Sequence, residues 1–257
     1  MGALRGVLGV LTDIDDTLTT FGAITADAFG ALQRLRDAGL RVVAITGRPM
    51  GWSEPFARDW PIDAIVAENG AVALFRDAGG GLAIEYAQDE TTRATNARRL
   101  NEAAARVLRE VPGSRLAQDS AGRVTDIAID HSEFAHLSPA QIEQVVAVMH
   151  AEGMNATVSS IHINGWFGEH TKLSGARWIV QRLLAGDLEA ERSRWVYIGD
   201  STTDQLMFGH FALSVGVANL MAFAEQLSVW PAYLTEGARG AGFAEVAQRL
   251  LAVRALS

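Results

Sequence analysis

The chain has 257 residues, of which 49% are apolar, which is enough to bury the core of one large domain or of two smaller ones. Its 22 basic and 30 acidic residues give a net charge of −8, which argues against a nucleic-acid-binding surface but not against an anionic substrate held by local cations. The absence of cysteine excludes disulfides, thiolate metal sites and thiol catalysis. We expect neither a signal peptide nor a membrane span, and therefore a cytoplasmic protein without a membrane or nucleic-acid partner.

The first part of the chain alternates short apolar strands with helical patterns. Strands are predicted at residues 7–12, 41–46 and 64–67. Between the first two, Thr25 is a suitable helix N-cap and Gly39 a suitable stop. After the third, Asn69 and Gly70 mark a tight turn, and three consecutive glycines at 79–81 indicate a hairpin. Strands that alternate with helices predict a parallel sheet with right-handed crossovers.

The middle of the chain has a different pattern. The predicted elements are a long polar helix at 90–110, a strand at 123–130, a helix at 139–151 and a strand at 156–163. These strands do not alternate regularly with helices, which is typical of an α+β arrangement. We therefore predict an inserted α+β cap domain at residues 87–164.

The regular alternation returns after Trp166. Helices are predicted at 172–185, 202–211 and 242–253, and strands at 195–198 and 212–217. We predict an α/β fold in which a doubly wound, Rossmann-like parallel-sheet core, formed by residues 1–86 and 165–257, is interrupted by the cap.

Carboxylates follow the first predicted strand. An apolar run leads directly into Asp13 and Asp15, and unpaired acids beside a core are strongly disfavoured unless they have a function. Thr46 ends the second strand, and Asp200 follows a later one. Because parallel strands end at a common edge, we expect these side chains to converge around a cation that offsets the repulsion between carboxylates. Hard oxygen ligands suit Mg²⁺, which is often shared with a substrate phosphate.

These residue types fit phosphoryl transfer through a covalent aspartyl-phosphate. Asp13 would attack phosphorus. Thr46, the Gly47 amide and Lys172 would hold the equatorial oxygens, over which the charge of the transition state spreads. Asp15 would protonate the leaving oxygen and then activate water as a general base.

Four segments in this order resemble the four motifs of the haloacid dehalogenase-like superfamily of phosphatases. They are residues 13–17, residues 44–48, Lys172 and residues 197–204. The resemblance covers essentially the whole core. A cap between the second and third motifs resembles the type IIB group, which includes sugar-phosphate phosphatases and a broad set of small phosphatases.

The resemblance implies a catalytic role for four matching residues. Asp13 falls on the nucleophile of the family and Asp15 on its acid/base. Thr46 and Lys172 fall on its phosphate-binding pair.

The resemblance also implies a magnesium site. Asp13 and Asp200 fall on the metal carboxylates, and the backbone carbonyl of Asp15 falls on a further ligand. Asp204 matches the last acid of the fourth motif, which supports the metal ligands.

Other polar residues carry weaker signals. Asp16 stands where the family often has glycine, and Thr203 where many type IIB members have asparagine. Arg48 either steers phosphate or is a surface charge at the start of a helix. Candidates for a substrate wall between the cap and the core are His162, Asn164, Trp166, Glu169 and His170.

We therefore predict a Mg²⁺-dependent phosphatase that acts on a small phosphorylated metabolite, with a sugar phosphate or a phosphoglycerate conjugate as the expected substrate. A phosphomutase that uses the same aspartyl-phosphate is an alternative. A third reading is a non-catalytic phosphate- or metal-binding module, although binding alone needs no acid/base two residues from a nucleophile. The sequence leaves open whether the chain is a monomer or a homodimer.

Overall fold

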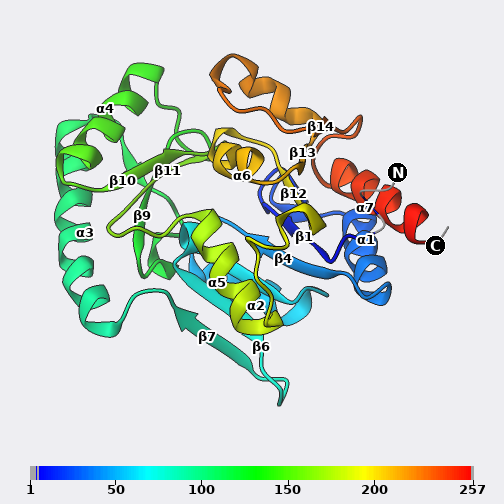
Figure 1. The fold of residues 1–257 in the computed structure, drawn as a ribbon. Coiled ribbons are helices and arrows are strands. Elements are labelled where there is room, and N and C mark those ends of the chain that lie inside the picture. Colours follow the sequence, from blue (N-terminus) through cyan, green and yellow to red (C-terminus); the bar gives the residue numbers. More distant parts are fainter. Residues whose placement is uncertain (1–3, 5, 256–257) are drawn as a thin grey trace.

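An eight-stranded sheet forms the centre of the larger part of the molecule (Figure 1). The computed structural model describes residues 4 and 6–255, so a few residues of the predicted core, at 1–3, 5 and 256–257, lie outside the described part. In order across the sheet, the strands are β14 (Tyr233–Leu234), β13 (Leu213–Gly216), β12 (Trp195–Gly199), β1 (Gly9–Thr12), β4 (Arg41–Ile45), β5 (Ala64–Ala67), β6 (Val72–Arg76) and β7 (Leu82–Tyr86). The first six are parallel, whereas β6 and β7 add an antiparallel edge, so the α/β core is confirmed together with the predicted hairpin.

Both faces of this sheet are buried, because its strands are apolar on both sides. Val10 and Val42 belong to one core cluster, whereas the next residues, Leu11 and Val43, belong to the other. The helices over the first cluster are α1 (Ala26–Asp37), α2 (Met50–Asp59) and α7 (Arg239–Ala255), and those over the second are α5 (Lys172–Leu184) and α6 (Gln205–His210). The sequence analysis missed α2, whose interior contains Pro55. Burial on two sides explains the continuous apolar runs of the sequence.

The inserted module is a four-stranded antiparallel sheet with two helices packed on it. The strands, in order, are β10 (Asn155–Val158), β11 (His162–Trp166), β9 (Asp126–Asp130) and β8 (Arg115–Leu116), and the helices are α3 (Glu90–Glu110) and α4 (Pro139–Ala151). They share a third apolar cluster that includes Ile129, Val145 and Ile163. In Figure 1 these elements form a separate body at the left of the core. The α+β character of the cap is thus as predicted.

The strand predicted at 156–163 is wrong, because two strands joined by a tight turn occupy this segment. Ser159 Oγ accepts hydrogen bonds from the backbone N–H groups of Ile161 and His162, at 3.3 and 3.0 Å. These bonds compete with the ladder of a continuous strand. β11 then runs on to Trp166, so the boundary predicted at 164 falls inside a strand.

Short elements complete the described part of the chain. They are the hairpin β2 (Thr19–Thr20) and β3 (Ala23–Ile24), and the 3₁₀ helices η2 (Glu68–Gly70), η3 (Ser120–Gly122), η4 (Arg192–Arg194), η5 (Thr202–Asp204) and η6 (Ala218–Gln226). The helix predicted at 202–211 therefore begins as η5 and continues as α6. None of the helices described within 4 and 6–255 has the length and apolar character needed to cross a membrane.

Buried polar contacts fasten the cap to the core. The carboxylate of Glu68, which follows β5 and is fully buried, accepts hydrogen bonds from the backbone N–H groups of Val124 and Thr125 in the cap. Close by, a Cβ placed on Gly51 of α2 would lie 3.0 Å from the Cα of Gly122 in η3. The two glycines thus allow the backbones of cap and core to touch.

Candidate active site

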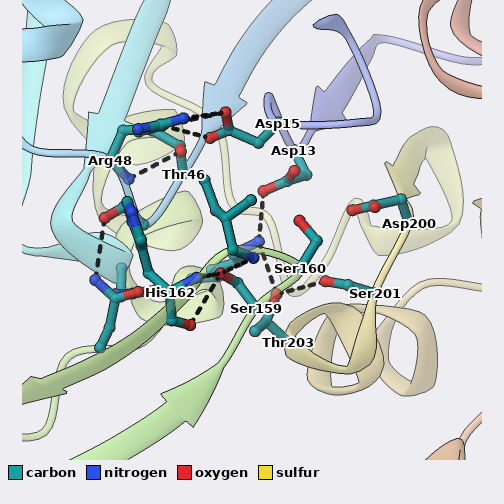
Figure 2. A pocket seen from close by; sticks show the side chains of 15 residues that line it. Asp13, Asp15, Thr46, Arg48, Ser159, Ser160, His162, Asp200, Ser201 and Thr203 are labelled. Carbon is teal, nitrogen blue, oxygen red and sulfur yellow. Dashed lines mark hydrogen bonds and ion pairs between the residues drawn. The ribbon is translucent and has the colours of Figure 1, made fainter. Parts of the chain in front are cut away.

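Residues from both domains line one cavity beyond the carboxyl ends of β1, β4 and β12 (Figure 2). The predicted site residues on its surface are Asp13, Asp15, Thr46, Gly47, Arg48, Lys172 and Asp200. The cavity has a volume of about 30 Å³, which is room for about two water molecules. Of the residues predicted to act in catalysis, phosphate binding or metal binding, only Asp204 does not line the cavity, and it lies just behind its surface.

Lys172, the first residue of α5, joins the beginning of the chain to its last motif. Its Nζ donates hydrogen bonds to Asp13 Oδ1 at 2.6 Å and to Asp204 Oδ1 at 2.8 Å. Thr203 Oγ1, at 3.4 Å, is a third acceptor. Burial raises the pKa of Asp13 to about 8, although the ammonium group of Lys172 opposes this shift. The lysine thus supplies the positive charge that a buried carboxylate requires.

Lys172 is also the only lysine among the 22 basic residues of the chain. An ammonium group is compact and directs three donors to acceptors on different sides, whereas a guanidinium is a planar fork. Three acceptors from different segments surround Lys172 Nζ, which suits the ammonium. The presence of a single lysine in the chain is therefore a further indication, beside the order of the motifs, that Lys172 belongs to the site.

Asp204 organises the loop after β12. Its Oδ2 accepts hydrogen bonds from the backbone N–H groups of Asp200 and Ser201, at 2.9 and 3.1 Å, while the Tyr197 hydroxyl donates to its Oδ1. A Cβ on Gly199 would lie 2.5 Å from Asp204, so only glycine fits there. With Asp204 held in this way, the carboxylate of Asp200 is free to line the cavity.

The backbone conformation of Asp16 accounts for the glycine that the resemblance leads us to expect at this position. Its φ is +54°, in the left-handed region that favours glycine. Its Oδ1 accepts a hydrogen bond from Arg239 Nε at 2.7 Å, so the extra carboxylate is neutralised outside the cavity. Asn219 Nδ2 donates to the carbonyl oxygen of Asp16 and to Asp200 Oδ2, at 2.9 and 3.2 Å. Arg239 and Asn219, which the sequence analysis did not single out, therefore support the metal-side loops.

The loop after β5 brings an amide to the phosphate-binding residues. Glu68, Asn69 and Gly70 all have positive φ, at 49°, 56° and 112°. Asn69 is 4% exposed and lines the cavity, and its Nδ2 has no hydrogen-bond partner in the described part of the chain. Its Oδ1 lies 3.2 Å from where a Cβ on Gly47 would be. Asn69 therefore has a donor to offer a ligand, beyond the turn chemistry that its sequence context indicates.

Arg48 is surrounded by carboxylates. Its Nε and Nη2 contact the carboxylate of Asp15 at 3.0 to 3.1 Å. The same guanidinium reaches across to the cap, where Asp119 Oδ2 and Glu133 Oε1 each lie at 3.1 Å. Glu133 in turn contacts His162 Nε2 at 2.8 Å. Arg48 thus links the predicted acid/base to two cap residues that the sequence analysis missed.

The predicted substrate wall is only partly right. His162 and Asn164 line the cavity, together with the Ser159–Ile161 turn. Trp166, Glu169 and His170 do not line it. Trp166 Nε1 instead donates to the carbonyl oxygen of His170, and the two rings stack with centroids 5.6 Å apart. Trp166 is the last residue of β11, two positions beyond Asn164 on the same face, and Glu169 and His170 follow the strand, so all three lie further from the turn that enters the site.

Comparison with known proteins agrees with this architecture. Residues 10–95 match the family model of haloacid dehalogenase-like hydrolases. The structure is similar to that of Thermoplasma acidophilum 0175, with a TM-score of 0.70 and 15% sequence identity over 95% of this chain and 98% of that one. It is also similar to a putative HAD/COF-like hydrolase from Plasmodium vivax, with a TM-score of 0.69 and 14% identity over 98% of this chain and 99% of that one. The family model thus matches the segment that carries the first two motifs, and the solved structures show that the whole chain shares their fold. The sucrose-phosphatase of Synechocystis, solved with sucrose and phosphate, is similar as well (0.68, 16%, 96% and 98%). No curated protein sequence matches the chain.

The charges of the site fit the small divalent cation that the resemblance implies. Within residues 4 and 6–255, no three His, Cys, Asp or Glu side chains are arranged to hold a metal by themselves. The ligand set that the resemblance implies requires only two carboxylates, Asp13 and Asp200, with the backbone carbonyl of Asp15. Burial and the nearby charge of Asp13 raise the pKa of Asp200 well above its ordinary value. Crowded, buried carboxylates of this kind are stabilised by a cation with hard-ligand preference.

Replacing Lys172 by arginine is expected to lower kcat/KM for p-nitrophenyl phosphate by roughly 100-fold, because the charge remains but the three-way geometry of the ammonium is lost. Arg177→Lys, a half-exposed exchange on the same helix, serves as the control. Urea unfolding of both variants separates loss of activity from loss of fold. Wild-type activity in Lys172→Arg would contradict the role given to this residue.

Proposed function

We propose that the protein is a Mg²⁺-dependent phosphatase that hydrolyses the phosphate monoester of a small metabolite through an aspartyl-phosphate on Asp13. The observation that carries this proposal is the convergence of Asp13, Thr46, Lys172 and Asp200, from four distant segments, on one cavity. The family match supports a hydrolase, and the similarity to a sucrose-phosphatase supports phosphate ester chemistry.

In the first half of the reaction, a carboxylate oxygen of Asp13 forms a bond to phosphorus while the bond from phosphorus to the ester oxygen breaks. Asp15 gives its proton to the departing oxygen, so that the product leaves as an alcohol. Thr46, Gly47 and Lys172 lie where they can hold the phosphoryl oxygens, and Lys172 already offsets the charge of Asp13. Arg48 fixes the orientation of the Asp15 carboxylate through its contacts with both oxygens.

In the second half, Asp15 takes a proton from a water molecule, whose oxygen attacks the phosphorus of the aspartyl-phosphate. The bond to Asp13 breaks and inorganic phosphate leaves. Asp13, Asp200 and the carbonyl of Asp15 would hold Mg²⁺, which supplies positive charge against the repulsion between the anionic ester and the anionic nucleophile. The cap closes the site against bulk water, which protects the intermediate from uncontrolled reaction.

Substitution of Asp13 and substitution of Asp15 are expected to block different steps of the reaction. Asp13→Asn should abolish hydrolysis of p-nitrophenyl phosphate and form no phosphoenzyme. Asp15→Asn should slow hydrolysis by roughly 100-fold or more and accumulate phosphoenzyme, because the general base of the second half is gone. Rapid acid quenching followed by intact-mass spectrometry detects the added phosphoryl group.

Asp37→Asn, at an exposed position, is the matched control for both variants. Normal turnover in Asp13→Asn would end the nucleophile assignment. Measuring free phosphate alongside the ester products distinguishes hydrolysis from transfer, because a phosphomutase returns the phosphoryl group to its substrate.

Removal of divalent metal should stop hydrolysis, and addition of Mg²⁺ should restore it, because Asp13 and Asp200 then regain the cation that offsets their repulsion. The measurement is the rate of p-nitrophenyl phosphate hydrolysis after chelation and dialysis, with metal content determined by mass spectrometry. Full activity in protein shown to be free of metal would contradict the cofactor assignment.

A further inference from the structure

The cavity has a phosphate end and an opposite wall. Asp13, Thr46 and Lys172 mark the phosphate end, so the alcohol part of the ester must extend toward the remaining lining. On the cap side that lining is the Ser159–Ile161 turn with His162 and Asn164, and on the core side it includes Arg48 and Asn69. Apart from Lys172, Arg48 is the only residue with a permanent positive charge among those that the structure describes around the cavity.

The charge of Arg48 is already taken up by protein carboxylates. Its Nε, Nη1 and Nη2 atoms all contact carboxylate oxygens, which belong to Asp15, Asp119 and Glu133. The guanidinium is 8% exposed, so these contacts are little screened by water. Arg48 therefore presents no unpaired charge that could attract a second anionic group of a substrate.

The residues behind the cavity wall add no net positive charge. Arg123 is buried behind Gly47, whose carbonyl oxygen accepts its hydrogen bond at 2.9 Å, and it pairs with Asp119 and Asp126. The two guanidiniums thus face four carboxylates, those of Asp15, Asp119, Asp126 and Glu133. Burial raises the pKa of Asp126 to about 7, and with that carboxyl and the general acid Asp15 both protonated, two carboxylates still offset the two guanidiniums.

The polar groups of the wall that can bind a ligand are neutral. Asn69 Nδ2 is buried and has no partner within the described residues. Ser160 contributes a hydroxyl to the cavity, and Figure 2 shows this side chain directed toward Asp13. Amide and hydroxyl groups of this kind pair with the hydroxyl groups of a ligand without requiring a charge on it.

From this arrangement we infer that the substrate is the phosphate ester of a neutral, polyhydroxylated alcohol, and that the carboxylates around Arg48 exclude esters that carry a second anionic group. The inference rests on the proposed phosphatase function and decides between the two substrate classes that the sequence left open. A carboxylate on the alcohol part would be placed in a buried wall without net positive charge, where like charges repel strongly. Glu133 and Asp119 are then specificity-determining residues of the cap.

Two pairs of esters test the inference, because the members of each pair differ chiefly in a hydroxymethyl group against a carboxylate. They are sorbitol 6-phosphate with 6-phosphogluconate, and glycerol 3-phosphate with 3-phosphoglycerate. The wild-type protein is expected to have a kcat/KM at least about 10-fold higher for the neutral member of a pair. Equal or higher kcat/KM for the carboxylate member would overturn the inference.

Variants that lack one carboxylate identify which residues cause the preference for the neutral ester. Glu133→Gln leaves Arg48 with one carboxylate fewer and should reduce the preference for the neutral ester by about 10-fold, through better turnover of the carboxylate ester relative to its partner. Glu143→Gln, an exposed exchange on α4 of the same cap, should leave the preference unchanged. Because each preference is a ratio within one variant, a general loss of activity or stability cancels. An unchanged ratio in Glu133→Gln would overturn the role of this residue.

Hydrolysis of p-nitrophenyl phosphate separates this inference from the proposed function. If that ester is hydrolysed but neither polyol phosphate is, the phosphatase function stands and the inference fails. If no phosphate ester is hydrolysed by the metal-loaded protein, the proposed function itself fails.

Discussion

The site depends on the burial of one ammonium group among acids. Lys172 reaches Asp13, 159 residues earlier in the chain, and Asp204, 32 residues later, and these contacts join α5 to β1 and to the loop after β12. A carboxylate buried without a partner would be strongly disfavoured, and removal of one member of such a group leaves the others uncompensated. The same contacts that stabilise the junction of three segments therefore also hold Asp13 at the surface of the cavity.

The catalytic end of the cavity could be predicted from the sequence because its signals are local. Asp13 and Asp200 directly follow apolar strands, and parallel topology brings the ends of such strands to one edge whatever their separation in the chain. The cap side could not be predicted in this way. Asp119 and Glu133 lie in irregular segments 71 and 85 residues from Arg48, and no periodicity or motif marks them as its partners. The strand predicted at 156–163 also concealed the turn at Ser159, because a single hydroxyl decides where that strand is broken.

Asp16 shows how backbone conformation and charge are balanced beside the site. The loop after β1 must turn through a left-handed residue, which an aspartate adopts less readily than glycine but more readily than most residues. The added carboxylate lies near Asp200, and Arg239 pairs with it on the outer side. Arg239 itself has a positive φ of 53° and lies over the ring of Phe21, with 4.4 Å between the guanidinium carbon and the ring centroid. The departure from glycine is thus compensated by a second set of residues more than 200 positions away in sequence.

Arg48 links the cap to Asp15, the predicted acid/base. With the cap in place, the guanidinium has carboxylates on both sides, Asp15 from the core and Asp119 and Glu133 from the cap. The cavity has room for about two water molecules, and its lining comes from the core and from the Ser159–Ile161 turn of the cap. Without the cap, Arg48 would keep only Asp15 of its three acidic partners, in a wetter and better screened environment. With the cap in place, Asp15 is therefore paired with a guanidinium that two cap carboxylates hold from the other side.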